Sequence, residues 1–143
     1  MSDNIQPGGD VVFVIGAEGR RLCVSSTVLK NSSPVLNSLL GPNFAEGQKL
    51  LNEWNAAISL PEDDHVALTI ILCVLHGRND RVPKVFPGDK LCDIAALCDK
   101  YDLFVPLKFA YQQWLDGSPC ITDSSELWIL MSAAYWFRLR WPG

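Results

Sequence analysis

The stretch VSSTVLKNSSPVLNSLLGPNFAEGQ, from Val24 to Gln48, decides the fold of this chain. It predicts the end of a strand, a short helix, a break, a second helix and a loop. Ser25 or Ser26 can cap the first helix, because a serine oxygen accepts a hydrogen bond from an otherwise unpaired N–H group. Proline is favoured at the first helical position, so Ser33-Pro34 begins the second helix. Gly41-Pro42 then ends it.

The apolar residues of this stretch divide it into two parts. Valines and leucines recur at helical spacing in both helices, which predicts that they face the core. They are Val28, Leu29, Val35, Leu36, Leu39 and Leu40. Residues 42–48 are not needed for this packing, so the loop is where we expect a partner contact.

Two strands are predicted before the end of this stretch. Residues 1–9, which include Pro7-Gly8-Gly9, are expected to be a flexible N-terminus. The β-branched run VVFVIG after Asp10 is typical of a strand. A turn at residues 16–19 and the alternating residues 21–24 complete a predicted β-hairpin.

One more strand and a long apolar helix are predicted after the stretch. Residues 43–56 are expected to be a loop and residues 57–60 a short strand. Asp63 or Asp64 is expected to cap the helix that follows, which continues to Arg78. Because this helix is apolar almost all round, we expect it to lie in the middle of the core.

Three further helices complete the predicted order of elements. They cover residues 90–103, residues 106–116 with Pro106 at the start, and residues 123–137. Too few strands alternate with helices for a doubly wound parallel sheet. The pattern favours an α+β fold, in which a cluster of helices packs on a small, mostly antiparallel sheet. The residues spaced for the inner faces of the first two helices are Leu91, Ile94, Ala95, Cys98, Tyr101, Leu107, Ala110, Tyr111 and Trp114.

Composition and charge exclude several classes of protein. The 143 residues suit one domain, and the hydrophobic content of 48% is enough for a core. The net charge is −4 and there is no basic stripe, which argues against nucleic-acid binding. No apolar run reaches the roughly 18–20 residues that a membrane span needs.

The cysteines indicate a reducing compartment. There are five, an odd number, and no C-x-x-C pair occurs. The polar start MSDNIQPGGD has no apolar signal segment. Reduced thiols and a cytoplasmic or nuclear location are therefore expected.

Several motifs, in order, resemble those of a BTB/POZ domain, and most closely the fungal members of that family. They are GDVVFVIG, RRLCVSSTVLKNSSPVLNSLLGPNFAEGQ, ISLPEDDHVALTIILCVLHGR and LCDIAALCDKYDL. The resemblance implies a BTB/POZ-like α+β domain over residues 10–117. Residues 118–143 then form a C-terminal helical extension, which we expect to be truncated because fungal members usually continue.

This chain also departs from the family pattern. Leu36 and Asn37 stand where many members carry an aromatic residue. The segment before Asp10 is short for the N-terminal exchange between protomers that many animal members show, which places an exchanged dimer in doubt.

The resemblance implies a non-catalytic protein–protein interaction module. Some members link a substrate to a cullin-type ubiquitin ligase, using a loop of the form hydrophobic-x-Glu. Phe44-Ala45-Glu46 has that form, so the candidate partner-binding residues are Asn43, Phe44, Glu46 and Gln48. A loop Phe can fill an apolar pocket of a partner while a carboxylate sets the register. Alternatively, Phe44 folds back onto the core and Glu46 is only solvated.

A second function is compatible with the same residues. The domain could be a homo-oligomerisation module of a longer regulatory or transcription-associated protein, with no role in ubiquitination. The family often dimerises, and the C-terminal tail is rich in aromatic residues that either pack on the domain or form a partner surface. These are Trp128, Tyr135, Trp136, Phe137 and Trp141.

No pattern in the sequence points to catalysis, a cofactor or a metal ion. His65, Cys73 and His76 come near one another on the predicted helix, but no fourth ligand with suitable spacing follows. The serine pairs lack a G-x-S-x-G motif and are explained by helix capping. There is no phosphate-binding glycine loop. The acidic run Glu62-Asp63-Asp64 is explained by the helix dipole at the start of the long helix.

Overall fold

The fold is α+β, as the sequence predicts. The computed structural model describes residues 3–42, 47–48, 56–85 and 88–116. The four strands are β1 (Asp3–Asn4), β2 (Val11–Ile15), β3 (Arg20–Val24) and β4 (Ala56–Leu60). The helices are α1 (Ser26–Ser32), α2 (Pro34–Leu39), α4 (His65–Leu75), the 3-10 helix η1 (Asn79–Arg81), α5 (Gly88–Tyr101) and α6 (Phe104–Asp116).

The sheet is mixed, which corrects the expectation of a mostly antiparallel sheet. Its order is β1-β3-β2-β4, and only the predicted β2–β3 hairpin is antiparallel. The pairs β1–β3 and β2–β4 are parallel, and Phe13 lies opposite Ile58 in the second. Between β3 and β4 the chain passes through α1 and α2, so β4 returns alongside β2 in the same direction, as a helical crossover allows.

The expected flexible N-terminus is wrong for residues 3–9, because they pack on the sheet. The backbone N–H groups of Ile5 and Gln6 donate to the carbonyl of Cys23, at 3.2 and 3.1 Å. Ile5 is fully buried. A Cβ atom on Gly9 would lie 2.3 Å from the Val24 carbonyl oxygen, so only glycine fits this close approach.

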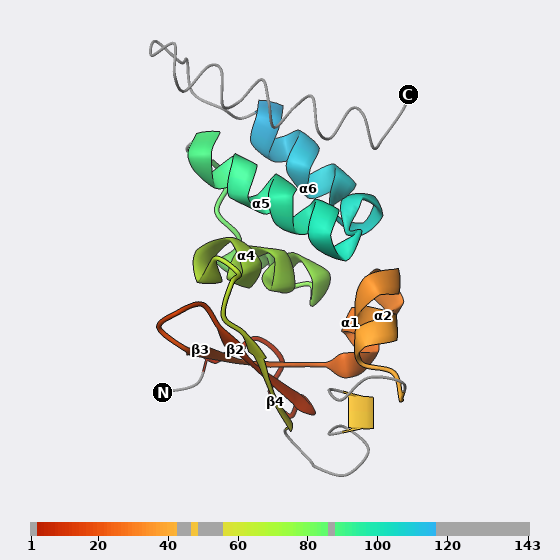
Figure 1. The fold of residues 1–143 in the computed structure, drawn as a ribbon. Coiled ribbons are helices and arrows are strands. Elements are labelled where there is room, and N and C mark those ends of the chain that lie inside the picture. Colours follow the sequence, from red (N-terminus) through yellow and green to blue (C-terminus); the bar gives the residue numbers. More distant parts are fainter. Residues whose placement is uncertain (1–2, 43–46, 49–55, 86–87, 117–143) are drawn as a thin grey trace.

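Helix α4 joins the sheet to the remaining helices. In Figure 1 it lies across one face of the sheet, and α5 and α6 stack on its other side. The prediction of a central, buried helix is confirmed, although the helix ends at Leu75 and Val66 is exposed. Its buried residues are Ala67, Leu68, Ile70, Ile71, Leu72 and Cys73.

Helices α5 and α6 complete the core with the predicted faces. Leu91, Ile94, Ala95, Cys98 and Tyr101 are buried on α5, and Leu107, Tyr111 and Trp114 on α6, with Ala110 partly buried. Helix α6 begins at Phe104, two residues before Pro106. Proline is tolerated there because N–H groups in the first turn have no partner within the helix.

The predicted loop and tail lie largely outside the described residues. Of the loop predicted at 43–56, only residues 47–48 and Ala56 are described, and Ala56 belongs to β4. The extension predicted at 118–143 lies outside as well. Over the part of the chain that is described, no helix is both long and apolar enough to cross a membrane.

Candidate protein-interaction surface

The candidate surface lies at the C-terminal end of α2, where the predicted loop begins. Gln48 is exposed, and its Nε2 donates a hydrogen bond to the Pro42 carbonyl. Gly47 is buried, and a Cβ atom on it would lie 1.6 Å from the Gly41 carbonyl oxygen. Residues 42 and 47–48 are therefore in contact, so the chain leaves and returns at nearly the same point.

The other three predicted contact residues cannot be placed. Asn43, Phe44 and Glu46 lie outside the described residues. Their direction and contacts thus stay a prediction, and only the two ends of their segment are part of the described surface.

The outer face of α2 adds an apolar hollow to this end of the molecule. The hollow has a volume of about 530 Å³ and is lined by Pro34, Val35, Ser38 and Leu39. Val35 is 40% exposed, so its predicted place in the core is wrong. The core side of α2 instead carries the buried Leu36 and Leu40. At 100° per residue Val35 points away from Leu36, a signal that the sequence does contain.

Ser33 fixes the orientation of α2. Its backbone N–H donates to the Leu29 carbonyl at 3.1 Å, and its hydroxyl accepts from the N–H of Leu36 at 3.0 Å. The same hydroxyl donates to the carbonyl of Tyr101 at the end of α5. One buried serine thus ends α1, caps α2 and ties both to α5, which confirms its predicted capping role.

Two side chains from distant segments hold the start of α1. Asp10 accepts from the backbone N–H of Ser26 at 2.8 Å and from its hydroxyl at 2.5 Å. Burial raises the pKa of the Asp10 carboxyl, but these two bonds outweigh it and the pKa lies below its usual value. Ser25 caps α1 by accepting from the N–H of Val28 at 3.4 Å. Of the two serines predicted as caps, Ser25 is therefore the one used.

His76 also holds the start of α1, and the hydrogen bonds of its ring require one tautomer. Nδ1 lies 2.7 Å from the carbonyl oxygen of Leu72, which can only accept, so Nδ1 carries the proton. Nε2 then accepts from the backbone N–H of Ser25 at 3.1 Å. Burial lowers the pKa of His76, with the bond to Leu72 acting in the opposite direction. The ring is therefore a neutral structural link between α4 and α1.

Asp63 has a role that the sequence does not reveal. It is buried, and it accepts from the hydroxyl of Tyr101 and from Nζ of Lys100, the latter at 2.5 Å. Burial and the neighbouring carboxylate both raise the pKa of Tyr101. The α4 cap is Asp64, which accepts from the N–H of Ala67 at 2.9 Å. The acidic run thus fixes the end of α5 as well as the start of α4.

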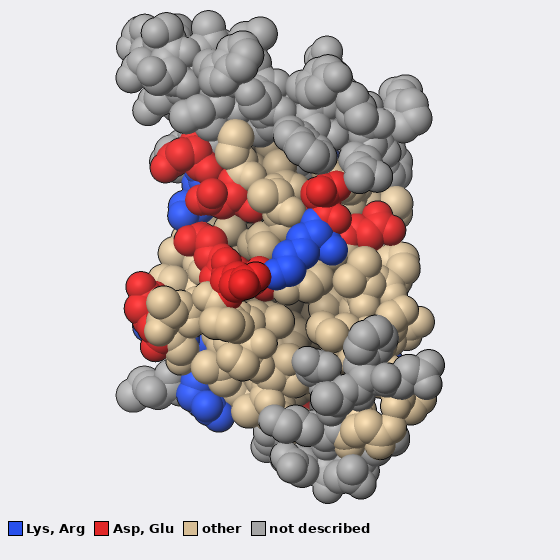
Figure 2. All heavy atoms as spheres, viewed as in Figure 1, with Lys and Arg blue, Asp and Glu red and all other residues tan. Residues whose placement is uncertain are grey.

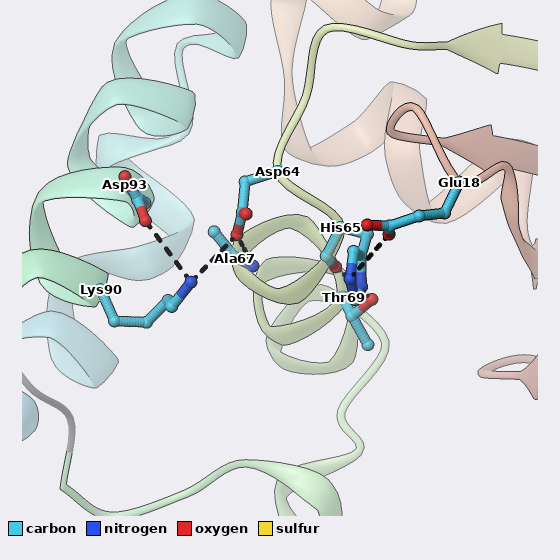
Figure 3. A network of polar contacts seen from close by, with 7 residues as sticks. All are labelled: Glu18, Asp64, His65, Ala67, Thr69, Lys90 and Asp93. Atoms are coloured by element: carbon cyan, nitrogen blue, oxygen red, sulfur yellow. Dashed lines mark hydrogen bonds and ion pairs between the residues drawn. The ribbon is translucent and has the colours of Figure 1, made fainter.

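Further polar contacts lie on the two sides of the start of α4 (Figure 3). On one side Lys90 of α5 bridges Asp64 at 3.3 Å and Asp93 at 3.5 Å. Burial raises the pKa of Asp64, but the Ala67 N–H and Lys90 bring it below its usual value. On the other side Nε2 of His65 pairs with Glu18 of the hairpin turn at 3.2 Å.

Outside its buried face, α6 exposes two large apolar side chains. Val105 is 70% exposed and Phe109 is 80% exposed, and their spacing of four places them on one side of the helix. Lys108 lies 5.7 Å from the centre of the Phe109 ring. Figure 2 shows acidic side chains gathered across the middle of one face of the molecule, with Lys or Arg side chains among them.

The arrangement offers little for chemistry within the described residues. No group of three or more His, Cys, Asp or Glu side chains there could hold a metal ion. His65 and His76 are engaged with Glu18 and Ser25 instead. Burial raises the pKa of the Cys98 thiol, which keeps it protonated at neutral pH.

Comparison with solved structures identifies the fold. The BTB (Tramtrack and Bric a brac) domain of human gigaxonin matches with a TM-score of 0.52 and 16% sequence identity, over 75% of this chain and 78% of that one. Neither the models of known protein families nor the curated proteins give a match. The chain therefore has a BTB-like fold.

Proposed function

We propose that this chain is a non-catalytic protein-interaction module of the BTB type, acting in the cytoplasm or nucleus. The BTB-like fold carries this proposal. The ordered motifs, whose resemblance is to the fungal members, support it further, because GDVVFVIG supplies β2 and LCDIAALCDKYDL supplies most of α5.

In its finer form, the proposal is an adaptor that links a substrate to a cullin-type ubiquitin ligase. The partner contact is assigned to Asn43, Phe44, Glu46 and Gln48. The bond from Gln48 to Pro42 supports this, because it brings the ends of the segment together beside α2. The hollow around Val35 supplies a neighbouring apolar surface. Together they provide a hydrophobic anchor and a polar rim, the usual make-up of an interface.

The test is a pull-down of a panel of fungal cullins with the wild-type chain and with Phe44→Ala and Glu46→Ala. We expect the wild type to retain one cullin and Phe44→Ala to weaken binding at least about tenfold, as the loss of an anchoring aromatic does. Matched controls are Phe109→Ala, an exposed Phe on α6, and Glu62→Ala, an exposed acid before α4. Both should bind like the wild type. Failure of the wild type to retain any cullin would exclude the ligase adaptor.

The alternative function is a homo-oligomerisation module without a role in ubiquitination. The exposed pair Val105 and Phe109 favours it, because a large apolar side chain that is 80% exposed gains free energy when a second copy covers it. Light scattering over a range of concentrations separates the two functions. A dimer that Phe109→Lys converts to a monomer supports this alternative, whereas a strict monomer rejects it.

A further inference from the structure

A hollow with an arginine rim lies between β3, the N-terminal half of α4 and the residues after η1. Its volume is about 270 Å³. This is below the roughly 300–1,000 Å³ of typical small-molecule pockets, so it suits a few side chains of a peptide better than a cofactor. We call it the arginine hollow. Its lining residues are Arg20, Arg21, Leu22, His65, Val66, Thr69, Ile70, Arg81 and Pro83.

The lining combines apolar groups with positive charges. Leu22 and Ile70 are buried residues of the core, and Val66 of α4 is 40% exposed. Arg20 and Arg21 on β3 and Arg81 at the end of η1 add three guanidinium groups. A bound segment would meet both an apolar contact and several hydrogen-bond donors.

Two of the three arginines have no partner among the residues that the structure describes. Within the described residues, the guanidinium groups of Arg20 and Arg21 make no hydrogen bond or ion pair, and both side chains are exposed. Other cations are engaged: Arg78 pairs with Asp80, Lys90 with Asp64 and Lys100 with Asp63. The charge of each of these exposed guanidinium groups stabilises an anion that binds beside it.

The acid of the hairpin turn, Glu18, pairs with His65 and makes no ion pair with Arg20 or Arg21. Glu18 is only two residues from Arg20, yet its carboxylate pairs with Nε2 of His65 at 3.2 Å (Figure 3). The chain as a whole has a net charge of −4, so the arginine hollow is a local reversal of sign. Such a reversal attracts negatively charged segments of a partner.

We propose that the arginine hollow binds an acidic, extended peptide segment of a protein partner. An apolar side chain of the peptide packs against Leu22, Val66 and Ile70. Flanking carboxylates bind the guanidinium groups of Arg20 and Arg21, whose planar geometry suits bidentate hydrogen bonds. The hollow does not include the loop at 42–48, so this contact is a second surface that does not depend on a cullin.

The test uses a fluorescein-labelled peptide of alternating Glu and Leu, with a matched peptide in which Gln replaces Glu. Binding is followed by fluorescence anisotropy, and NMR of the Leu22, Val66 and Ile70 methyl groups places it. We expect saturable binding of the Glu peptide that weakens with salt, with shifts at these methyl groups. The Gln peptide should bind at least about tenfold more weakly, because charged hydrogen bonds are the stronger ones.

Charge variants then assign the contact to the two arginines. The double variant Arg20→Gln/Arg21→Gln should lose at least about tenfold in affinity for the Glu peptide. The control Lys30→Gln/Lys108→Gln removes the same charge from α1 and α6 and should bind like the wild type. The double variant Arg20→Glu/Arg21→Glu should gain affinity for a Lys-Leu peptide, which a misfolded protein would not do.

Three results would each overturn the proposal. They are no binding of the Glu peptide up to millimolar concentration, equal binding of the Gln peptide, and equal loss in the lysine control. Binding of the Glu peptide with methyl shifts confined to α6 would overturn it as well, since the site would then lie elsewhere.

Discussion

His76 is the residue that makes the packing of α1 depend on pH. Its Nε2 accepts a hydrogen bond from the Ser25 N–H. Protonation of Nε2 would remove this acceptor and place two N–H donors against each other. Burial lowers the pKa of the folded ring below 6.5, the value expected in the unfolded chain. The unfolded chain therefore takes up a proton first as the pH falls. The contribution of His76 to stability is complete above pH 6.5 and is lost as the pH falls towards the lower pKa of the folded state.

We predict that the free energy of unfolding decreases between pH 7.5 and pH 5.5. One proton gives a slope of at most about 1.4 kcal/mol per pH unit. Urea unfolding of the wild type and His76→Gln at both values measures it, and the variant should be less stable at pH 7.5 but show a smaller decrease. His65→Gln, which changes the histidine paired with Glu18, is the control and should keep the decrease. An unchanged slope in His76→Gln would contradict this role.

The carboxyls of Asp10 and Asp64 do not contribute to the decrease between pH 7.5 and pH 5.5, because their pKa values lie below 3.8.

At the scale of elements, the short helices α1 and α2 depend on Ser33. Helices of this length are not stable in isolation, so their orientation comes from caps and packing. Ser33→Ala removes the α2 cap and the bond to the Tyr101 carbonyl in a buried place. We expect a loss of about 1–3 kcal/mol in the free energy of unfolding, measured in urea.

Two serines of the same segment provide controls for this prediction. Ser38→Ala lies on the exposed face of α2 and should change stability by less than about 0.5 kcal/mol. Ser25→Ala should cost less than Ser33→Ala, because its capping bond is longer, at 3.4 Å, and is partly exposed. Equal effects of Ser33→Ala and Ser38→Ala would mean that Ser33 is not the junction between α1, α2 and α5.

The caps could be predicted because they are local. Ser25, Ser33 and Asp64 each act on an N–H group three residues later, a spacing that is readable in the sequence. The start of α6 was missed by two residues, because a proline fits anywhere in a first turn. The prediction for Val35 is wrong because it treats Val35 and Leu36 as one apolar face, whereas a step of 100° per residue turns Val35 away from the buried Leu36.

At the scale of the whole molecule, features set by the local pattern of residues could be predicted, whereas features set by contacts between distant segments could not. The α+β class and the central position of α4 follow from the pattern of apolar residues. The parallel β1–β3 pair, the partner of Asp63 and the place of Ile5 depend on segments distant in sequence, for which the residues alone give no signal. For the candidate site, the sequence indicated the segment 42–48, but it gave no sign of the contact between its ends or of the arginine hollow.

The N-terminal segment connects the edge of the sheet to the residues of η1. Ile5 is fully buried, and its carbonyl accepts from Nη1 of Arg78 at 3.3 Å, while Arg81 donates to the Asn4 carbonyl at 3.4 Å. Residues 3–5 therefore contact both β3 and the 3-10 helix η1 with its N-cap residue Arg78. A truncated side chain at this point leaves a cavity in the core rather than a change at the surface.

We predict that Ile5→Ala lowers the free energy of unfolding by about 2–5 kcal/mol, the usual effect of such a cavity. Urea unfolding of Ile5→Ala beside Val105→Ala measures it, and the second variant, at a 70% exposed position, should change stability by less than about 0.5 kcal/mol. Hydrogen exchange gives an independent check, because the Ile5 and Gln6 N–H groups bonded to the Cys23 carbonyl should exchange as slowly as those of β2. A small loss in Ile5→Ala together with rapid exchange at both groups would show that residues 3–9 are not part of the folded core. The β1–β3 pair would then contribute little to stability, and β3 would be an edge strand open to a partner.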